Sequence, residues 1–389
     1  MDGNADNSLM GYLSIIPDPR IERSRRHNLL DILIIAVCAV ICGAEGWTDI
    51  EDFGISKEAW FREFLELPSG IPSHDTFRRI FLILDPLVFQ QCFMEWIGAV
   101  NRSLFKKDII SIDGKTLRGS LDRANEKSAL HMISAWSSNA SVVMGQMKSD
   151  GKSNEITSSP ELLKLLQLKG CVVTMDAMNC QKKTVEQIVN QGGDYLLSLK
   201  DNHPDMKRNV EDNFDEMARR RKKPWAYDKY EIQEKGHGRI ETRKHTVIYK
   251  GNEEIWGLID LHNEWKNLNS ILKIESERIN LQTGVISNEN RYYITSMKDD
   301  AKTIAEATRE HWNIENKLHW RLDVLMREDE CRVRAGNSAE NFATLRHLAF
   351  NLLKTEPTKK SLRRKQKTAG WDHSYLLQIL FNNGKSRGF

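Results

Sequence analysis

The segment that decides the fold reads Asp108-Ile-Ile-Ser-Ile-Asp-Gly-Lys-Thr-Leu-Arg-Gly119. Its first half is a short apolar run, which predicts a buried strand that ends at the carboxylate of Asp113. A second segment, Cys171-Val-Val-Thr-Met-Asp176, repeats the pattern of an apolar strand followed by an aspartate. Because functional sites in open α/β sheets gather at strand ends, we expect Asp113 and Asp176 to lie at such a site.

The residues around these two strands predict a mixed sheet flanked by helices. Residues 131–136 and 141–147 have the pattern of two short strands in a hairpin. Further on, helical patterns from residue 158 and over 182–191 alternate with the strands at 171–176 and 194–200. Three strands followed by a βαβαβ alternation indicate an α/β fold.

Working outward from this centre, the chain divides into five expected segments. Apolar residues at three- and four-residue steps indicate helices before residue 104, and β patterns return after residue 226. The expected segments are an N-terminal all-α module (1–103), the first part of an α/β core (104–226), a β-rich insertion (227–298), a helical end of the core (299–355) and a basic C-terminal tail (356–389).

Composition excludes several classes of protein. The 389 residues carry 57 Lys and Arg against 54 Asp and Glu, so the net charge is only +3 and any basic surface must be local. Basic residues concentrate in the run Arg219–Lys223 and after Leu353. The six cysteines form no CxxC pair, and the longest apolar run, Ile32–Ala44, is shorter than the roughly 20 residues of a membrane span. We therefore expect a soluble cytoplasmic protein without disulfides or membrane association.

The two strand-end aspartates suggest metal chemistry if a third carboxylate joins them. Glu315, on the late helical segment, is the candidate. Carboxylate oxygens suit Mg²⁺, and two such ions about 3.5–4 Å apart can drive an in-line phosphoryl displacement. Taken singly, an aspartate at a strand end is more often a turn former or a helix cap.

Six motifs in order carry a resemblance to a known family. The chain resembles the H-repeat-associated, Rhs-element-linked insertion-sequence transposases over most of residues 8–355. The motifs are Pro72–Arg79 (PSHDTFRR), Ser111–Gly119 (SIDGKTLRG), Thr174–Gln181 (TMDAMNCQ), Gly193–Asn202 (GDYLLSLKDN), Gly236–Arg243 (GHGRIETR) and His311–Val324 (HWNIENKLHWRLDV).

The resemblance implies a DDE transposase with a ribonuclease-H-like core and a β-rich insertion before the helix that bears the glutamate. It implies that Asp113, Asp176 and Glu315 bind two Mg²⁺ ions, which Mn²⁺ could replace. The expected reaction is phosphodiester hydrolysis at the element's ends, followed by strand transfer with the 3′-hydroxyl. The expected partners are double-stranded terminal inverted repeats and target DNA, bound by a nucleoid-associated homodimer, with residues 1–103 holding the DNA end.

Basic and polar side chains near these motifs are candidates for DNA contact. Related transposases carry an Arg four residues before the glutamate and a Lys seven after it, where this chain has His311 and Leu322. In this chain the two basic DNA contacts are either absent or supplied by other residues, for which Lys317 and Arg321 are the candidates. The expected DNA-binding residues are Lys115, Arg118, Lys200, Asn202, His311, Lys317, Arg78 and Arg79.

The helix around Glu315 allows other interpretations. His311, Glu315, His319 and Asp323 recur every four residues and would form one polar stripe on a continuous helix. Such a stripe could bind zinc or be an ordinary solvated face, and Asp323 could replace Glu315 as the third carboxylate. At the level of function, the rivals are a catalytically silent DNA-binding remnant of a transposable element and a structure-selective nuclease on the same core.

Overall fold

The computed structural model describes residues 8–101, 107–122, 126, 128–151, 154–220, 225–251, 256, 259–260 and 263–381. The chain forms two compact units. Unit 1 comprises Met1–Phe105, Gly114–Asn154 and Glu315–Phe389, and unit 2 comprises Lys106–Asp113 and Glu155–Ile314.

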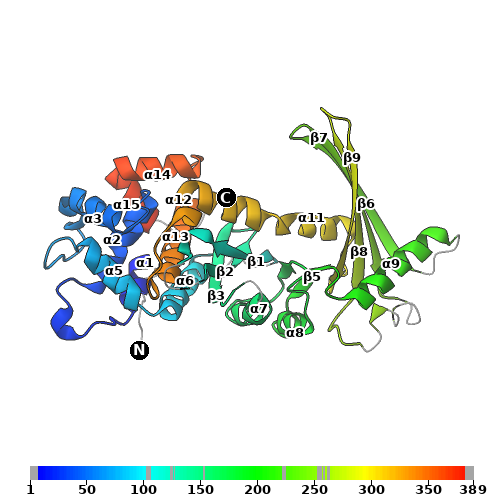
Figure 1. Cartoon of the computed structure of the whole chain (residues 1–389), viewed down its shortest axis with the longest axis horizontal. Coiled ribbons are helices and arrows are strands. Elements are labelled where there is room, and N and C mark those ends of the chain that lie inside the picture. Colours follow the sequence, from blue (N-terminus) through cyan, green and yellow to red (C-terminus); the bar gives the residue numbers. More distant parts are fainter. Residues whose placement is uncertain are drawn as a thin grey trace. The chain divides into compact units, whose positions relative to one another are not determined.

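The helical part of unit 1 is built around α2 (Leu29–Ile41), which is apolar on every side and almost wholly buried. Its one acidic residue, Asp31, accepts a hydrogen bond from the backbone of Leu67 at 3.0 Å, which compensates a carboxylate that burial would otherwise penalise. Around α2 lie α1 (Leu9–Ser14), α3 (Trp47–Ser56), α4 (Glu58–Phe61), α5 (His74–Ile83), α6 (Pro86–Asn101), α12 (Trp320–Met326), α13 (Ser338–Thr355), α14 (Leu362–Trp371) and α15 (His373–Phe381) (Figure 1).

Unit 1 also contains a β-hairpin that packs against α13. Strands β2 (Leu130–Ser137) and β3 (Val142–Ser149) pair antiparallel, as the sequence predicts. The side chain of Asn351 bonds both backbone groups of Val143, at 2.9 and 2.8 Å, and Gln146 donates to Thr344. These buried polar contacts fix the hairpin on the helix.

Unit 2 is a mixed sheet with helices on both faces. Its strands lie in the order β1-β4-β5-β9-β8-β7-β6, with β1, β4 and β5 parallel and the others antiparallel to their neighbours. The strands are β1 (Ile109–Leu117, shared with unit 1), β4 (Val172–Met175), β5 (Asp194–Leu199), β6 (Ala226–Gly236), β7 (Arg239–Tyr249), β8 (Ser270–Asn280) and β9 (Ile286–Thr295). The helices are α7 (Glu155–Lys164), α8 (Lys182–Asn190), α9 (Pro204–Arg219) and α11 (Ala301–His311).

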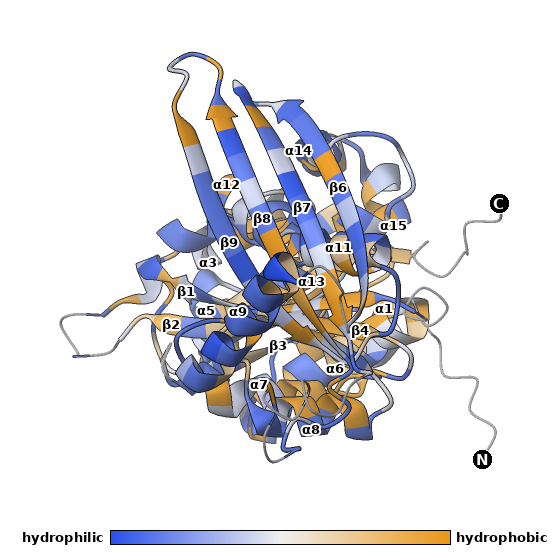
Figure 2. Cartoon of the chain, turned by 90° about the vertical axis from the view of Figure 1, so that its right-hand side faces the viewer, coloured by the Kyte–Doolittle hydropathy of each residue, from blue (hydrophilic) through white to orange (hydrophobic). Residues whose placement is uncertain are grey.

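The long antiparallel strands β6 to β9 lie in the segment that the sequence predicts to be a β-rich insertion. Helix α11 packs its apolar face on Val247, Leu272 and Ile274 near the base of these strands, and α9 covers the opposite face (Figure 1). Beyond the helices the strands are mainly hydrophilic, as Figure 2 shows, because both faces meet solvent there. The structure thus confirms a mixed α/β fold with a large mixed sheet.

The helical pattern expected over residues 301–326 is confirmed with one interruption, because α11 ends at His311 and a π-helical segment, Ile314–His319, precedes α12. Residues 356–389, expected as a basic tail, include the two helices α14 and α15. The apolar side chains of α15 repeat at helical spacing and are buried, a signal that the local excess of charge obscured.

Within the described residues, no single helix has both the length and the apolar character to cross a bilayer. Among the described residues, α5 and α6 together are long and apolar enough, but these two helices meet at an angle of 91°.

Candidate active site

Asp113 and Asp176 come from neighbouring parallel strands at the same level. Strands β1 and β4 pair in the register Ile109↔Val172 to Ile112↔Met175, and the two aspartates are the next residue on each strand. Adjacent strands lie about 4.8 Å apart, and residues at matching positions point to the same face. The two half-buried aspartates therefore come from matching positions on neighbouring parallel strands of unit 2.

A buried asparagine holds the carboxylate of Asp176. Asn179, only 1% exposed, donates to Asp176 Oδ1 from its backbone N–H at 3.3 Å and from its side-chain amide at 3.1 Å. The amide oxygen of Asn179 in turn accepts from Ser159 at 2.7 Å, and its Nδ2 lies 3.3 Å from Glu155 Oε2. This network orients one oxygen of Asp176 and leaves the other for a ligand.

The turn after Asp176 is also tied to the loop after β5. The side-chain amide of Asn202 donates to the carbonyl of Ala177 at 2.7 Å. His203 Nε2 lies 2.6 Å from the carbonyl of Cys180, so this nitrogen carries the proton. Asn202, expected to contact DNA, thus positions the turn, whereas Lys200 at the end of β5 is exposed.

The end of α11 is fastened to the same face of the sheet. His311 Nδ1 lies 3.1 Å from Thr174 Oγ1, which donates to Ser111 Oγ at 3.2 Å. Ser111 also donates to the carbonyl of Glu310 at 3.3 Å. Ser111 and Thr174 stand two residues before the paired aspartates, so they point to the same face. His311 therefore has a position over the sheet, in addition to any role towards DNA.

Glu315 opens the π-helical segment in unit 1 and is exposed. Its Oε2 lies 3.8 Å from Nδ1 of His319, which is buried. Interruptions of this kind in an α-helix occur often at functional sites, because the wider turn re-aims side chains. The π-helical segment therefore interrupts the even spacing expected on a continuous helix, although Glu315 and His319 remain close to each other.

Lys115 is committed to an internal ion-pair network. Its ammonium group bonds Asp323 and, at 2.8 Å, the buried carboxylate of Glu328. Burial would raise the pKa of Glu328, but the adjacent Lys115 holds it below its usual value. Burial likewise raises the pKa of Asp323. This arrangement argues against phosphate contact by Lys115 and against Asp323 as the third metal ligand.

The remaining candidate DNA contacts lie at the surface. Arg118 is 85% exposed and its Nε lies 3.6 Å from Asp329. Arg78 and Arg79 are exposed on α5, with Arg78 3.1 Å from Asp75. Lys317 is exposed on the π-helical segment. All four side chains can reach an anionic ligand, since exposed ion pairs are weak. Of the basic run Arg219–Lys223, residues 221–223 lie outside the described residues.

Several residues of this site were not singled out from the sequence. Asn179, Ser111 and Thr174 lie inside the aspartate motifs, and that location was the available signal. Glu155 and His203 lie in no metal-binding pattern, so only the fold reveals their place beside the turn after Asp176.

Comparison with known proteins assigns the chain to a family. The family model described as "Transposase DDE domain" matches residues 104–352, and "DDE_Tnp_1-associated" matches residues 10–97. The chain belongs to the DDE transposase family. Membership confirms the resemblance read from the six motifs.

The relatives of this DDE transposase family member are found in bacteria. The protein named "H repeat-associated putative transposase YhhI" from Escherichia coli (strain K12) is 44% identical, with 97% of this chain and 99% of that protein covered. "Putative transposase YncI" from Escherichia coli O157:H7 is 40% identical, with 96% and 94% covered. A solved structure, the piggyBac transposase synaptic complex with hairpin DNA, aligns with 100% of this chain and 80% of the piggyBac chain. The TM-score of this alignment is 0.40, which is too low to support an argument.

Proposed function

We propose that this family member is an active DNA transposase that cuts phosphodiester bonds at the ends of its element and joins the freed 3′-hydroxyl to target DNA. The observation that carries the proposal is the pair Asp113 and Asp176, each of which directly follows the matched register of the neighbouring parallel strands β1 and β4. Family membership supplies the reaction class, and the pair supplies the carboxylates that such a reaction requires.

The strand order supports a ribonuclease-H-like core. Strands β3, β2 and β1 are consecutive neighbours, and β1, β4 and β5 continue as parallel strands. We propose that β1 to β5, with helices α7, α8 and α11, form this core and that β6 to β9 are an insertion into it.

The residues present fit a divalent metal. Two carboxylates in matched register offer hard oxygen ligands of the kind that Mg²⁺ prefers, and Asn179 fixes the orientation of one of them. We propose Asp113, Asp176 and Glu315 as the ligands of two Mg²⁺ ions, with Mn²⁺ as a substitute. When bound, the ions would activate the attacking oxygen and stabilise the leaving oxygen.

The chain's own residues would then orient the substrate. Lys200, Arg118 and Lys317 are exposed cations that can bind phosphates of the terminal inverted repeats and of the target. His311, held against Thr174, would keep the end of α11 in place on the sheet. We propose that two copies act together at the nucleoid, since an element has two ends.

The silent-remnant alternative rests on His311 and Leu322, where related enzymes carry basic residues. The side chain of Leu322 is 0% exposed in α12. A lysine there would be buried, so the difference reflects packing in this chain and does not by itself argue for lost activity. A structure-selective nuclease would share the cleavage step and lack the joining step.

The test is to incubate the purified protein with the DNA that flanks its gene and a target plasmid, with and without Mg²⁺. We expect metal-dependent nicking at the element ends and joined products, both abolished by Asp113→Asn, Asp176→Asn or Glu315→Gln. Cleavage without joining would select the nuclease. Specific binding of the ends without cleavage in either Mg²⁺ or Mn²⁺ would select the remnant.

A further inference from the structure

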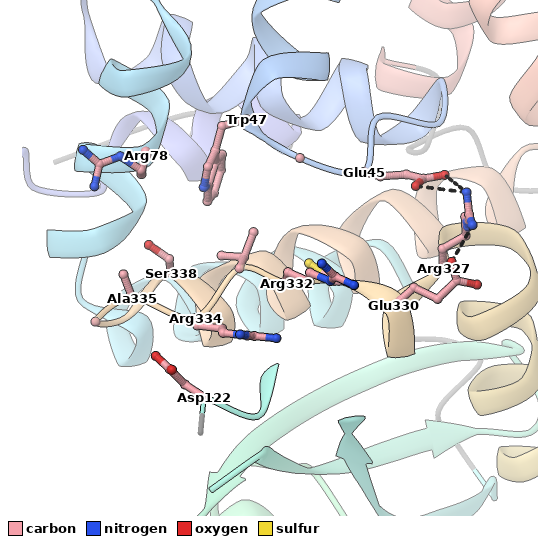
Figure 3. A pocket seen from close by; sticks show the side chains of 14 residues that line it. Glu45, Trp47, Arg78, Asp122, Arg327, Glu330, Arg332, Arg334, Ala335 and Ser338 are labelled. Carbon is pink, nitrogen blue, oxygen red and sulfur yellow. Dashed lines mark hydrogen bonds and ion pairs between the residues drawn. The ribbon is translucent and has the colours of Figure 1, made fainter. Parts of the chain in front are cut away.

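Unit 1 contains a large open pocket. Its volume is about 970 Å³, at the upper end of the range for small-molecule sites. Its walls come from the start of α3, from α5 and from the segment that joins α12 to α13 (Figure 3). The lining includes four arginines against three carboxylates: Arg78, Arg327, Arg332 and Arg334 against Glu45, Asp122 and Glu330.

Internal pairing uses only part of this charge. Arg327 bridges the two glutamates, with 3.4 Å to Glu45 and a shorter contact to Glu330, as the dashed lines in Figure 3 show. Arg327 is therefore the ion-pair partner of both Glu45 and Glu330. Arg332 is exposed and makes no ion pair or hydrogen bond with any residue that the structure describes. The positive charge of Arg332 is therefore available to a ligand.

Arg334 is held in place by one of its five N–H groups. Its Nε donates to the carbonyl of Gly119 at 3.0 Å, which leaves the outer nitrogens for another acceptor. At Gly119 an added Cβ would lie 2.4 Å from the carbonyl oxygen of Cys331, so the two backbones are in close contact. The arginine-bearing segment is thereby anchored, which reduces the entropy lost when it binds a ligand.

An aromatic wall completes the pocket. Trp47 packs against Phe81 with ring centres 5.0 Å apart, and against the edge of Phe342 at the same distance. Trp47 remains half-exposed on the pocket side of this cluster. A rigid apolar wall beside guanidinium groups suits a ligand that has both anionic and apolar parts, such as the phosphates and deoxyriboses of a DNA backbone.

We propose that this pocket binds the sugar–phosphate backbone of duplex DNA, with Arg332 and Arg334 as the phosphate contacts. The planar guanidinium fork matches phosphate oxygens, and a volume of about 970 Å³ can hold more than a single small anion. The inference rests on the proposed function only in taking DNA as the ligand, and it assigns a second DNA contact region apart from the metal-binding carboxylates.

The test measures binding of full-length protein to a fluorescent duplex of the element end in EDTA, by anisotropy over a series of salt concentrations. Arg332→Gln should weaken binding and lower the slope of log K against log salt by about 0.9, the value for one lost phosphate contact. Arg332→Lys should retain most of the slope. The matched control is Arg208→Gln, an exposed arginine on α9 of unit 2, which should leave the slope unchanged.

Equal slopes for the wild type and Arg332→Gln would overturn the proposal. So would a loss of inorganic phosphate binding with no change in DNA binding, because the pocket would then hold a small anion only. Arg334→Gln serves as a second variant, with its melting temperature measured because the Gly119 contact is lost. Binding in EDTA requires no catalysis, so failure of the cleavage assay and failure of this proposal are separate results.

Discussion

Asp176 Oδ1 accepts two hydrogen bonds from Asn179, and this is the clearest case in which a single residue prepares the site. Local pattern predicts the apolar runs that precede the two aspartates, although β1 continues past Asp113 to Leu117, and the orientation of Asp176 depends on the groups behind it. Buried second-layer groups of this kind commonly change metal affinity or activity by about 10–100-fold when they are removed.

We predict that Asn179→Ala will lower Mg²⁺-dependent cleavage by about 10–100-fold and raise the Mg²⁺ concentration needed for half-maximal rate. Asn179→Asp should be as severe, because it places a carboxylate against Asp176. Cleavage rates across a Mg²⁺ titration measure the effect. Asn190→Ala, at the exposed end of α8, is the matched control. A lower rate with an unchanged Mg²⁺ dependence would contradict the positioning role.

His347 is a second residue whose behaviour follows from its surroundings. It is buried in α13, and burial lowers its pKa to about 4 despite the nearby Glu328; Lys115, His319 and Arg346 oppose its protonation. The unfolded chain takes up a proton near pH 6.5, whereas the folded chain does so only near 4. Stability must therefore be lost as the pH falls through this window.

We predict that the free energy of unfolding falls by up to about 3 kcal/mol between pH 7 and pH 4 because of this histidine. Urea denaturation at a series of pH values measures it. His347→Gln should flatten the curve over this window, and His373→Gln, at the exposed start of α15, should not. An unchanged pH profile in His347→Gln would show that another group dominates.

At the scale of elements, the segment from α11 to α12 is not a regular helix. The π-helical stretch Ile314–His319 changes the direction of the side chains that follow. Leu322, at a position where related enzymes carry lysine, lies fully buried, while Val324 two residues later is exposed. Helical spacing in the sequence could not predict that Leu322 is buried and Val324 exposed, because a prediction from spacing assumes one uninterrupted helix.

We predict that Leu322→Lys destabilises the protein by roughly 3–5 kcal/mol and does not increase DNA cleavage, because it buries an unpaired charge. Val324→Lys should change the free energy of unfolding by less than about 0.5 kcal/mol. Chemical denaturation of both variants gives the comparison. A stable Leu322→Lys with increased cleavage would mean that this position does face DNA.

At the scale of the whole molecule, helices α14 and α15 pack against the other helices of unit 1. Lys57 Nζ bonds the carbonyl of Gly370 at 3.1 Å and contacts His373, whose ring stacks on Trp60. Lys365 is buried and pairs with Glu356 at 3.0 Å. Helices α14 and α15 therefore contribute to the core of unit 1, although their charge suggested a solvated tail.

We predict that Leu376→Ala, which empties a fully buried position in α15, costs about 2–5 kcal/mol of unfolding free energy. A flexible basic tail would show no such loss. Gln378→Ala, on the exposed face of the same helix, is the control and should be near neutral. Urea unfolding curves distinguish the two interpretations, and equal midpoints would show that α15 does not contribute to the core.

The local sequence pattern was sufficient to predict the two aspartates of the site but not the partners of Lys115. Asp113 and Asp176 follow from apolar runs that end in a carboxylate, because strand formation and chain direction are local properties. Lys115 was assigned to DNA because it follows Asp113 closely. Its actual partners, Asp323 and Glu328, lie some two hundred residues further along the chain.

The sequence by itself determined the family, the alternation of strands and helices, and the two apolar runs that lead into Asp113 and Asp176, because motif order and hydrophobic period are properties of the linear chain. Only the tertiary structure decided which charges remain available. It buries Lys115, Leu322 and Lys365 and leaves Arg332 exposed. The physical reason is that desolvation and ion pairing depend on neighbours in space, and those neighbours come from distant parts of the chain.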